Sequence, residues 1–267
     1  MILRHAREPM EGLSAENTFE AIDERSGAAI SSCKIYVHES AELFPARPLR
    51  IYMDIQGENV PDALLGAAVA RAKEIARGIK APCRIFTQVE AGNEDLMNSL
   101  SVLGFKDNDG LVCMRRELRE NEHADLPIGC VAVRDDLDDP IEQKYFLERY
   151  NLLFSEEYDF EWLADFRSRE GFKRILIVAP TGMAGEAVVW HEDGAGKICW
   201  LYTSKKWRRL GVARCLLNLA CADFAEEGLA VAEAELQARI PGMLHVMESA
   251  GFRQAELLLR YPGIDIN

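Results

Sequence analysis

Five basic side chains lie within ten residues of an otherwise acidic chain. They are Lys205, Lys206, Arg208, Arg209 and Arg214. The whole protein has a formal net charge of -13 at pH 7, with 44 acidic and 31 basic side chains among 267 residues. Positive charge concentrated against that background predicts a binding site for an anion.

The sequence on either side of this cluster predicts how an anion would be held. The apolar run 197–203 is typical of a strand, and residues 212–227 have apolar side chains at helical spacing. The first turn of a helix offers free main-chain N–H groups and the positive end of the helix dipole, which together suit a diphosphate. Gly211 would let the main chain approach such a ligand closely, and Ala213 would keep the first helical turn narrow.

The spacing Arg208-x-x-Gly211-x-Ala213 resembles the coenzyme A loop of the GNAT acetyltransferase superfamily. The elements around it follow the order that ends a GNAT domain. After the strand and helix already described come a strand over 229–238, a short helix over 242–250, the pair Gly251-Phe252 and a strand over 255–261. The resemblance implies an acyl-CoA-dependent N-acetyltransferase with acetyl-CoA as its co-substrate and no metal.

The resemblance also implies where the coenzyme would bind. The main chain at Leu201, Tyr202 and Thr203 would pair with the pantetheine arm, and an N–H group there would polarise the thioester carbonyl. The basic turn would surround the pyrophosphate. Its expected binding residues are Arg208, Arg209, Leu210, Gly211, Val212, Ala213 and Arg214.

A related pattern occurs twice, on either side of a polar segment. Residues 116–127 are rich in charge and end at Pro127, which is typical of a linker. Gly104-Phe105 in the first half matches Gly251-Phe252 in the second, which suggests an internal repeat. We therefore expect an α+β protein of two GNAT-like domains, over 1–119 and 128–267 with a linker at 120–127. Each domain should be a mostly antiparallel twisted sheet flanked by helices.

The first half resembles a shortened GNAT domain without a clear opening strand or two-helix segment. Its counterpart of the coenzyme loop, residues 54–68, has no basic residue and carries Asp54, Glu58 and Asp62. These carboxylates would repel a diphosphate, and a helix dipole worth ~1 kcal/mol is too weak to hold one there. This half is predicted to be a scaffold, a dimer surface or a wall of the acceptor site.

Several positions depart from the family pattern. Met247 stands where many members carry a tyrosine that protonates the departing thiolate, Ile240 replaces a frequent asparagine, and Lys197 stands where some members carry a basic glutamate. The catalytic acid and base are therefore unassigned. Losing such a group costs roughly 10²- to 10⁴-fold in rate, so activity is still expected. The alternative is a coenzyme-binding sensor or interaction module without chemistry.

The acceptor is expected to be a cationic amine of a small molecule or peptide. Residues 155–162 contain four carboxylates and three aromatic side chains where GNAT members line the acceptor pocket. The same stretch could instead be an exposed acidic loop. Glu192, Glu233 and Glu235 are the carboxylates that could take a proton from the amine, and the last two share one face of a predicted strand.

Composition excludes other classes. The acidic balance, with a pI near 5.0, argues against nucleic-acid binding. Seven cysteines without a Cys-x-x-Cys pair indicate buried thiols rather than a zinc site or a disulfide framework. No apolar run is long enough to span a bilayer, so we expect a cytoplasmic protein without membrane contact. The sequence is compatible with a homodimer.

Overall fold

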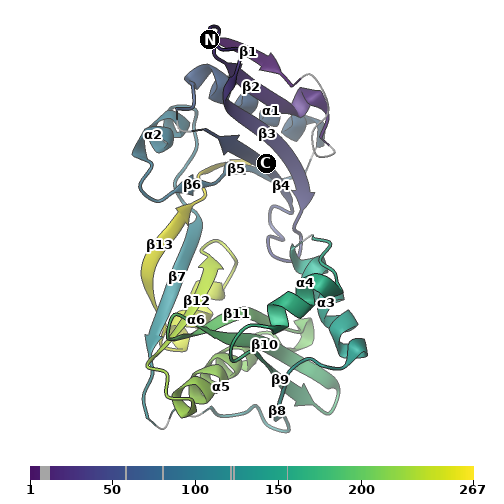
Figure 1. Ribbon diagram of the computed structural model, residues 1–267. Helices are drawn as coiled ribbons and strands as arrows, with labels where there is room; N and C mark the ends of the chain where they lie inside the picture. The colour runs from purple at the N-terminus through teal and green to yellow at the C-terminus, as the bar shows by residue number, and fades with distance from the viewer. Residues whose placement is uncertain (7–12, 58, 80, 121, 123, 155) are drawn as a thin grey trace. The chain divides into compact units, whose positions relative to one another are not determined.

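The computed structural model describes residues 1–6, 13–57, 59–79, 81–120, 122, 124–154 and 156–267. They form two compact units (Figure 1). The first unit comprises Met1–Leu111 and Leu257–Asn267, and the second comprises Val112–Glu256. Each unit combines a sheet with helices, which confirms the predicted α+β fold. No helix in the described part of the chain is long and apolar enough to cross a bilayer.

The first unit is a six-stranded sheet with two helices, α1 (Asp62–Ile79) and α2 (Glu94–Val102). Its strand order is β1-β2-β3-β4-β5-β14, and all neighbours are antiparallel except β4 and β5. The strands are β1 (Ile2–His5), β2 (Thr18–Ile22), β3 (Ala29–Glu39), β4 (Leu49–Gln56), β5 (Cys83–Thr87) and β14 (Gly263–Ile266). The short strand β6 (Val89–Glu90) and a 3-10 turn at Ala15–Asn17 complete the unit.

Helix α1 packs on this sheet through residues spaced three and four apart. Leu65, Val69 and Ala72 are buried in one cluster with Ile51 and Met53 of β4. Residues three and four apart lie on one face of a helix, and alternate residues lie on one face of a strand. The apolar face of α1 therefore packs against the apolar face of β4. The pattern explains why both elements were predictable from the sequence.

The second unit is a sheet with four helices. In this unit the strand order is β13-β7-β12-β11-β10-β9-β8. Its strands are β7 (Gly110–Glu117), β8 (Val131–Asp135), β9 (Lys173–Ala179), β10 (Gly182–Glu192), β11 (Ala195–Thr203), β12 (Val231–Gln237) and β13 (Arg253–Arg260). Its helices are α3 (Pro140–Phe154), α4 (Phe160–Arg167), α5 (Val212–Glu226) and α6 (Met243–Ser249), with a 3-10 turn at Lys205–Trp207.

Helices cover both faces of the second sheet. Helix α5 approaches so closely that a Cβ on Gly196 would lie 2.4 Å from the ring of Phe224. On the other face, α3 and α4 pack aromatic side chains against β11, with the rings of Tyr150 and Trp200 4.9 Å apart. Strand β11 therefore faces α5 at Gly196 and α3 at Trp200.

The unit boundaries differ from those expected from the sequence. Residues Val112–Glu117 of β7 belong to the second unit, between β12 and β13 in the strand order. Conversely, β14 lies antiparallel to β5 at the edge of the first unit's sheet. Each unit thus contains one strand from the far half of the chain, whereas the sequence suggested a simple division at 119 and 128. The proline at 262 separates β13 from β14 because it lacks an N–H group for a sheet.

Candidate active site

Strands β11 and β12 stay together over only two pairs of residues. They pair in parallel at Gly196 with Ala232 and at Lys197 with Glu233, and the described residues give no further pair between them. β11 nevertheless continues to Thr203. Beyond Lys197, the main chain of β11 therefore has an edge that β12 does not use.

Leu201, Tyr202 and Thr203 lie on this separated part of β11. On their other edge they remain paired with β10, where Tyr202 lies opposite Glu186. All three are half-buried. Their free edge offers main-chain N–H and C=O groups to an extended ligand, at the place that the sequence assigned to a pantetheine arm.

A β-bulge interrupts β11 just before these residues. Val188 pairs with Trp200 and Val189 pairs with Ile198, so Cys199 has no partner on β10. A bulge bends its strand, which here happens where β11 leaves β12. The Cys199 thiol donates to the main-chain oxygen of Val188 at 3.0 Å, and burial raises its pKa. It therefore stays protonated and is a packing group rather than a nucleophile.

The basic turn leads from β11 into α5. Arg209 has a φ of 63° and Gly211 a φ of 82°, directly before the first residue of the helix. A left-handed φ suits glycine, whereas it costs a residue with a side chain of order 1 kcal/mol. No atom lies within 4 Å of the place where a Cβ on Gly211 would stand, so the space beside it is open.

Most predicted residues of the turn face solvent. Arg208, Arg209, Leu210, Gly211 and Arg214 are exposed. By contrast, Val212 is buried and Ala213 half-buried, so these two could offer a ligand little more than their main-chain amides.

The unpaired groups of the turn fit a diphosphate. Among the described residues, the amides of Arg209 to Arg214 have no main-chain acceptor, as expected for a helix start. The buried indole N–H of Trp207 also has no partner there. Arg208 Nε and Lys206 Nζ donate to main-chain oxygens of Thr203 and Thr181, which ties the turn to the ends of the neighbouring strands.

The corresponding strands of the first unit do not separate in this way. β4 and β5 pair from Leu49–Cys83 through Met53–Thr87, and Thr87 Oγ1 donates to the Met53 oxygen at 2.7 Å. Gly66, the counterpart of Gly211, lies inside α1 rather than before it. In the described part of the first unit, the two parallel strands thus pair over five residue pairs, against two in the second unit, and the matching glycine does not precede the helix.

Solved structures that resemble this chain include N-acetyltransferases. A GCN5-related N-acetyltransferase from Sphaerobacter thermophilus superposes with a TM-score of 0.54 and 16% identity, over 96% of this chain and 82% of that one. A probable N-acyltransferase from Enterococcus faecalis V583 gives a TM-score of 0.54 and 7% identity, over 92% of this chain and 61% of that one. The protein has the GNAT fold.

A further solved structure and the sequence comparisons agree with a similarity in fold only. The glucosamine N-acetyltransferase region of a fungal multi-domain β-N-acetylglucosaminidase gives a TM-score of 0.50 and 10% identity, over 92% of this chain and 33% of that one. No known family's sequence model and no curated protein matches the chain. At such identities the similarity concerns the fold alone.

Within the GNAT fold, Glu233 lies where the two strands part. Its carboxylate accepts from Lys197 Nζ at 2.6 Å and from both Nε and Nη2 of Arg115, at 2.8 and 2.5 Å. The hydrogen bond from Lys197 is the main reason that the pKa of Glu233 is lowered, and Arg115 adds to it against the effect of burial. A carboxylate held ionised by two cations is a poor proton acceptor.

Glu235 is the nearest alternative on the same face of β12. It is exposed and forms no ion pair with any described residue. It lies near Cys113 of β7. Burial is the main cause that raises the pKa of the Cys113 thiol, and the negative charges of Glu233 and Glu235 raise it further. The sequence could not separate Glu233 from Glu235, because only the structure shows which carboxylate has cationic partners.

Glu192 is the third predicted carboxylate. It is exposed near the β10–β11 turn, 3.6 Å from Arg169 and 4.0 Å from Lys197. These contacts are long, so it is a solvated member of the same charged group.

The sequence missed one carboxylate on the α3 side of the sheet. Glu186 is fully buried on β10, accepts from Arg149 at 2.8 and 2.9 Å, and lies 3.3 Å from Trp200 Nε1. Arg149 belongs to α3, so the pair fixes that helix against the strand opposite Tyr202. An acidic residue inside the apolar run of β10 was the available signal.

The positions that depart from the family pattern have structural roles. Met247 is 1% exposed and packs in the core, where it cannot reach a thiolate. In the first unit, Asn93 caps α2 by accepting from the Leu96 amide.

In the predicted acceptor wall, residues 155–162, some side chains stabilise the fold and others are exposed to solvent. Tyr158 stacks on Trp162 with ring centres 4.3 Å apart, and Asp159 caps α4 by accepting from the Trp162 amide at 2.9 Å. Glu156 and Glu157 are exposed. One of the four carboxylates thus serves the helix, while these two remain available to a cation.

Proposed function

We propose that the protein is an acyl-CoA-dependent N-acetyltransferase whose active site lies in the second unit. The observation that carries this proposal is the early separation of β11 from β12 beside a glycine turn with free amides. This arrangement provides main-chain groups for an extended amide-containing arm and, at its end, donors for a diphosphate. The similarity in fold to N-acetyltransferases supports it.

Different residues would bind the pantetheine arm and the diphosphate of the coenzyme. Leu201, Tyr202 and Thr203 would hold the pantetheine arm through their main chain. The amides around Gly211 would bind the diphosphate, with charge support from the exposed Arg209 and from the other basic side chains of the turn. An N–H group of Leu201 or Tyr202 would stabilise the oxyanion that forms on the thioester carbonyl.

Glu235 is our candidate for the general base. It would take a proton from the ammonium group of the acceptor, directly or through one water. The neutral amine then forms a C–N bond with the thioester carbon, and the C–S bond breaks. The proton left on the new amide nitrogen passes to the departing thiolate, and Glu235 returns its own proton to solvent. Since Met247 supplies no acid, the thiolate leaves without a dedicated proton donor.

The acceptor in this proposal is a cationic amine. Glu156 and Glu157 are exposed beside the stacked pair Tyr158 and Trp162, which gives a negative and aromatic surface. Both features attract cations, and the net charge of the chain raises their local concentration further.

A coenzyme-binding protein without activity is the second candidate. The methionine at 247 and the pairing of Glu233 with Lys197 favour it, because neither side chain is then able to transfer a proton. Binding measurements cannot separate the two candidates. Transfer of the acyl group can.

The test measures release of free coenzyme thiol from acetyl-CoA with a panel of cationic, neutral and acidic amines. We expect amine-dependent release with at least one cationic amine and none with Gly211→Glu. Acetyl-CoA binding without turnover for any amine would support the sensor, and absence of binding would overturn both candidates.

A further inference from the structure

The end strand of the second unit's sheet is β8, which pairs with β9 along one of its edges. Among the described strands β9 is its one neighbour, and the pairing runs from Val131–Val178 to Asp135–Arg174. Alternate residues of such a strand direct their main-chain N–H and C=O groups away from the sheet. No main-chain hydrogen bond from another described segment covers this edge between residues 131 and 135. The outer edge of β8 is therefore a template for one more strand.

The side chains of β8 on the α3 side of the sheet are apolar and exposed. Val131 and Val133 are 56% and 41% exposed. They share a face with Asp135, because alternate residues of a strand point the same way. Arg174 donates to Asp135 of β8 and to Glu142 of α3, which identifies this face as the α3 side. The two valines thus form an apolar patch at the edge of the sheet.

Helix α3 carries a second exposed apolar stripe. Its residues Ile141, Tyr145 and Leu152 are each more than half exposed. Their spacing of four and seven residues places them on one face of the helix. The neighbouring Glu142 is tied to Arg174, whose other partner belongs to β8, so the stripe begins close to the end of that strand. Apolar side chains of both elements therefore meet solvent at this side of the unit.

The charged residues of β8 are neutralised within the unit. Arg134 donates to Asp223 of α5 at distances of 2.6 to 2.9 Å. Asp135 accepts from Arg174 at 2.7 and 2.8 Å. Each charge of the strand thus has a counter-ion in its own chain. No net charge on β8 would repel a second copy of the same strand.

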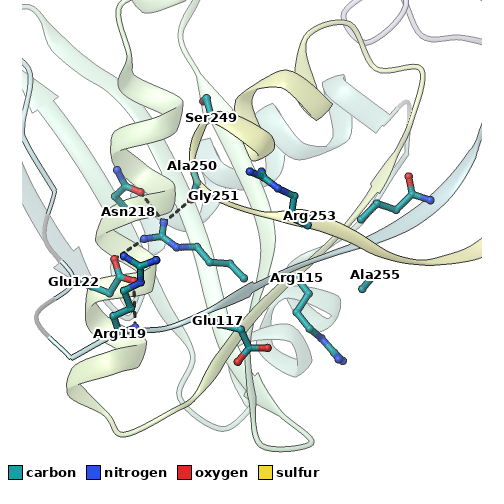
Figure 2. A pocket seen from close by; sticks show the side chains of 12 residues that line it. Arg115, Glu117, Arg119, Glu122, Asn218, Ser249, Ala250, Gly251, Arg253 and Ala255 are labelled. Atoms are coloured by element: carbon teal, nitrogen blue, oxygen red, sulfur yellow. Dashed lines mark hydrogen bonds and ion pairs between the residues drawn. The ribbon is translucent and has the colours of Figure 1, made fainter.

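The opposite end of the same sheet has the charged side chains that are common on edge strands. Figure 2 shows Arg115 and Glu117 on β7 and Arg253 on β13, the end strand of the unit on that side. Residues 253–256 of β13 are all exposed and include Glu256. Charge on an edge strand disfavours pairing with other chains, whereas exposed valines favour it. The two ends of this sheet therefore differ in their capacity to associate.

We infer that β8 pairs with β8 of a second copy of this chain, antiparallel and about a two-fold axis at Ala132. In this register Val131 of one copy lies opposite Val133 of the other, so apolar side chains meet across the axis. An axis at Val133 would instead place Val131 opposite Asp135. Antiparallel pairing about a two-fold axis keeps the same face of both sheets on one side. The two α3 helices therefore lie on the same side of the joined sheet.

A second copy suits this surface because the surface is its own complement. Stable dimers bury on the order of 1,000 Å² or more, and two strands of five residues are too short to supply that area alone. The exposed stripe of α3, present twice on the same side, adds the apolar area that the strands lack. The inference is independent of the proposed function, because β9 and β10 separate β8 from β11 in the strand order.

The first experiment measures the mass of the full chain by analytical ultracentrifugation. Wild type at about micromolar concentration should sediment as a dimer, with twice the 30.0 kDa of one chain. Val133→Lys should raise the dissociation constant of the dimer at least about a hundredfold, because it places two like charges near the axis. Val102→Lys changes an exposed valine of α2 in the first unit and should remain a dimer. With circular dichroism showing that the variants are folded, a monomeric wild type or a dimer that persists in Val133→Lys would overturn the inference.

Two cysteine variants test the register. Val131→Cys and Val133→Cys, left to exchange subunits and then mildly oxidised, should form a disulfide-linked dimer because these positions lie opposite each other. Neither variant should do so alone, since copies of one position are two residues out of register, about 8 Å between Cα atoms and beyond a disulfide's reach. Wild type is the blank, because its cysteines are buried or half-buried. No link in the mixture, or a link in either variant alone, would overturn the pairing at Ala132. Neither experiment measures coenzyme binding or acyl transfer, so the proposed function is tested separately.

Discussion

The ammonium group of Lys197 lies 2.6 Å from the carboxylate of Glu233, at the last pair of residues that joins β11 to β12. Arg115 completes the group from β7. This ion pair fastens the two strands where they part and removes Glu233 from the list of free proton acceptors. It also links the stability of the second unit to pH.

Glu233→Gln should lower the free energy of unfolding near neutral pH by about 1–2 kcal/mol, less than for a fully buried pair because the Arg115 side chain is 52% exposed. In the folded protein the pKa of Glu233 lies below its ordinary value of 4.5. Its stabilisation is therefore present above that value and is lost as pH falls through the folded-state pKa. Denaturant unfolding of both proteins between about pH 3 and 8 should show the difference disappear at low pH. A difference independent of pH would contradict this.

Glu235→Gln should lower kcat by about 10²- to 10⁴-fold and leave the dissociation constant of acetyl-CoA unchanged. Acceptor amines that are already neutral at the assay pH should lose less, because they need no base. Glu256→Gln, an exposed carboxylate on β13, is the matched control and should turn over like wild type. A uniform loss for all amines would indicate a structural role for Glu235 instead.

Gly211→Glu should weaken coenzyme binding by about a thousandfold, because it places bulk and negative charge where the diphosphate approaches the main chain. Gly228→Glu is the matched control, since Gly228 also has a positive φ of 84° and open space but lies beyond the other end of α5. Its affinity should be that of wild type. Circular dichroism of both variants checks the fold, and retained binding by folded Gly211→Glu would place the diphosphate elsewhere.

Calorimetry should give one coenzyme site per chain. In the first unit, β4 and β5 stay paired up to Met53 and Thr87, and residues 54–68 carry no basic side chain. Gly211→Glu in the full chain should therefore remove all the heat of binding. A remaining site of full enthalpy in that variant would show that the first unit also binds the coenzyme.

Glu156→Gln combined with Glu157→Gln should raise the KM of a cationic acceptor several-fold at low salt, with little effect at high salt, where surface charges are screened. A neutral acceptor should not respond. Glu248→Gln with Glu256→Gln removes the same charge elsewhere and serves as the control. If acidic amines such as glutamate are the best substrates, the proposed acidic wall is wrong.

The basic turn and its helix could be predicted because their signals are local. Gly211 and the apolar spacing of α5 lie within a few residues of one another, and the helix begins at Val212 as the spacing predicts. Strands β1 and β14 have weaker local signals. β1 is four residues long with two basic side chains, and β14 owes its place to pairing with β5 from the far half of the chain.

The candidate site was harder to predict than the fold, because it depends on contacts between residues that are far apart in the sequence. The separation of β11 from β12 is a matter of strand register, which no short window of sequence contains. Likewise, Glu233 and Glu235 look alike along the chain. The partner that distinguishes them, Arg115, lies 118 residues away.

The exchange of strands sets an order of events during synthesis. Most of the first unit leaves the ribosome early, but its sheet lacks the partner of β5 until β14 has been made. The second unit, about 145 residues long, must be translated in between. At typical rates this takes on the order of ten seconds, during which the edge of β5 is an open template for other strands. The unit that is synthesised first is therefore the last that can complete its fold.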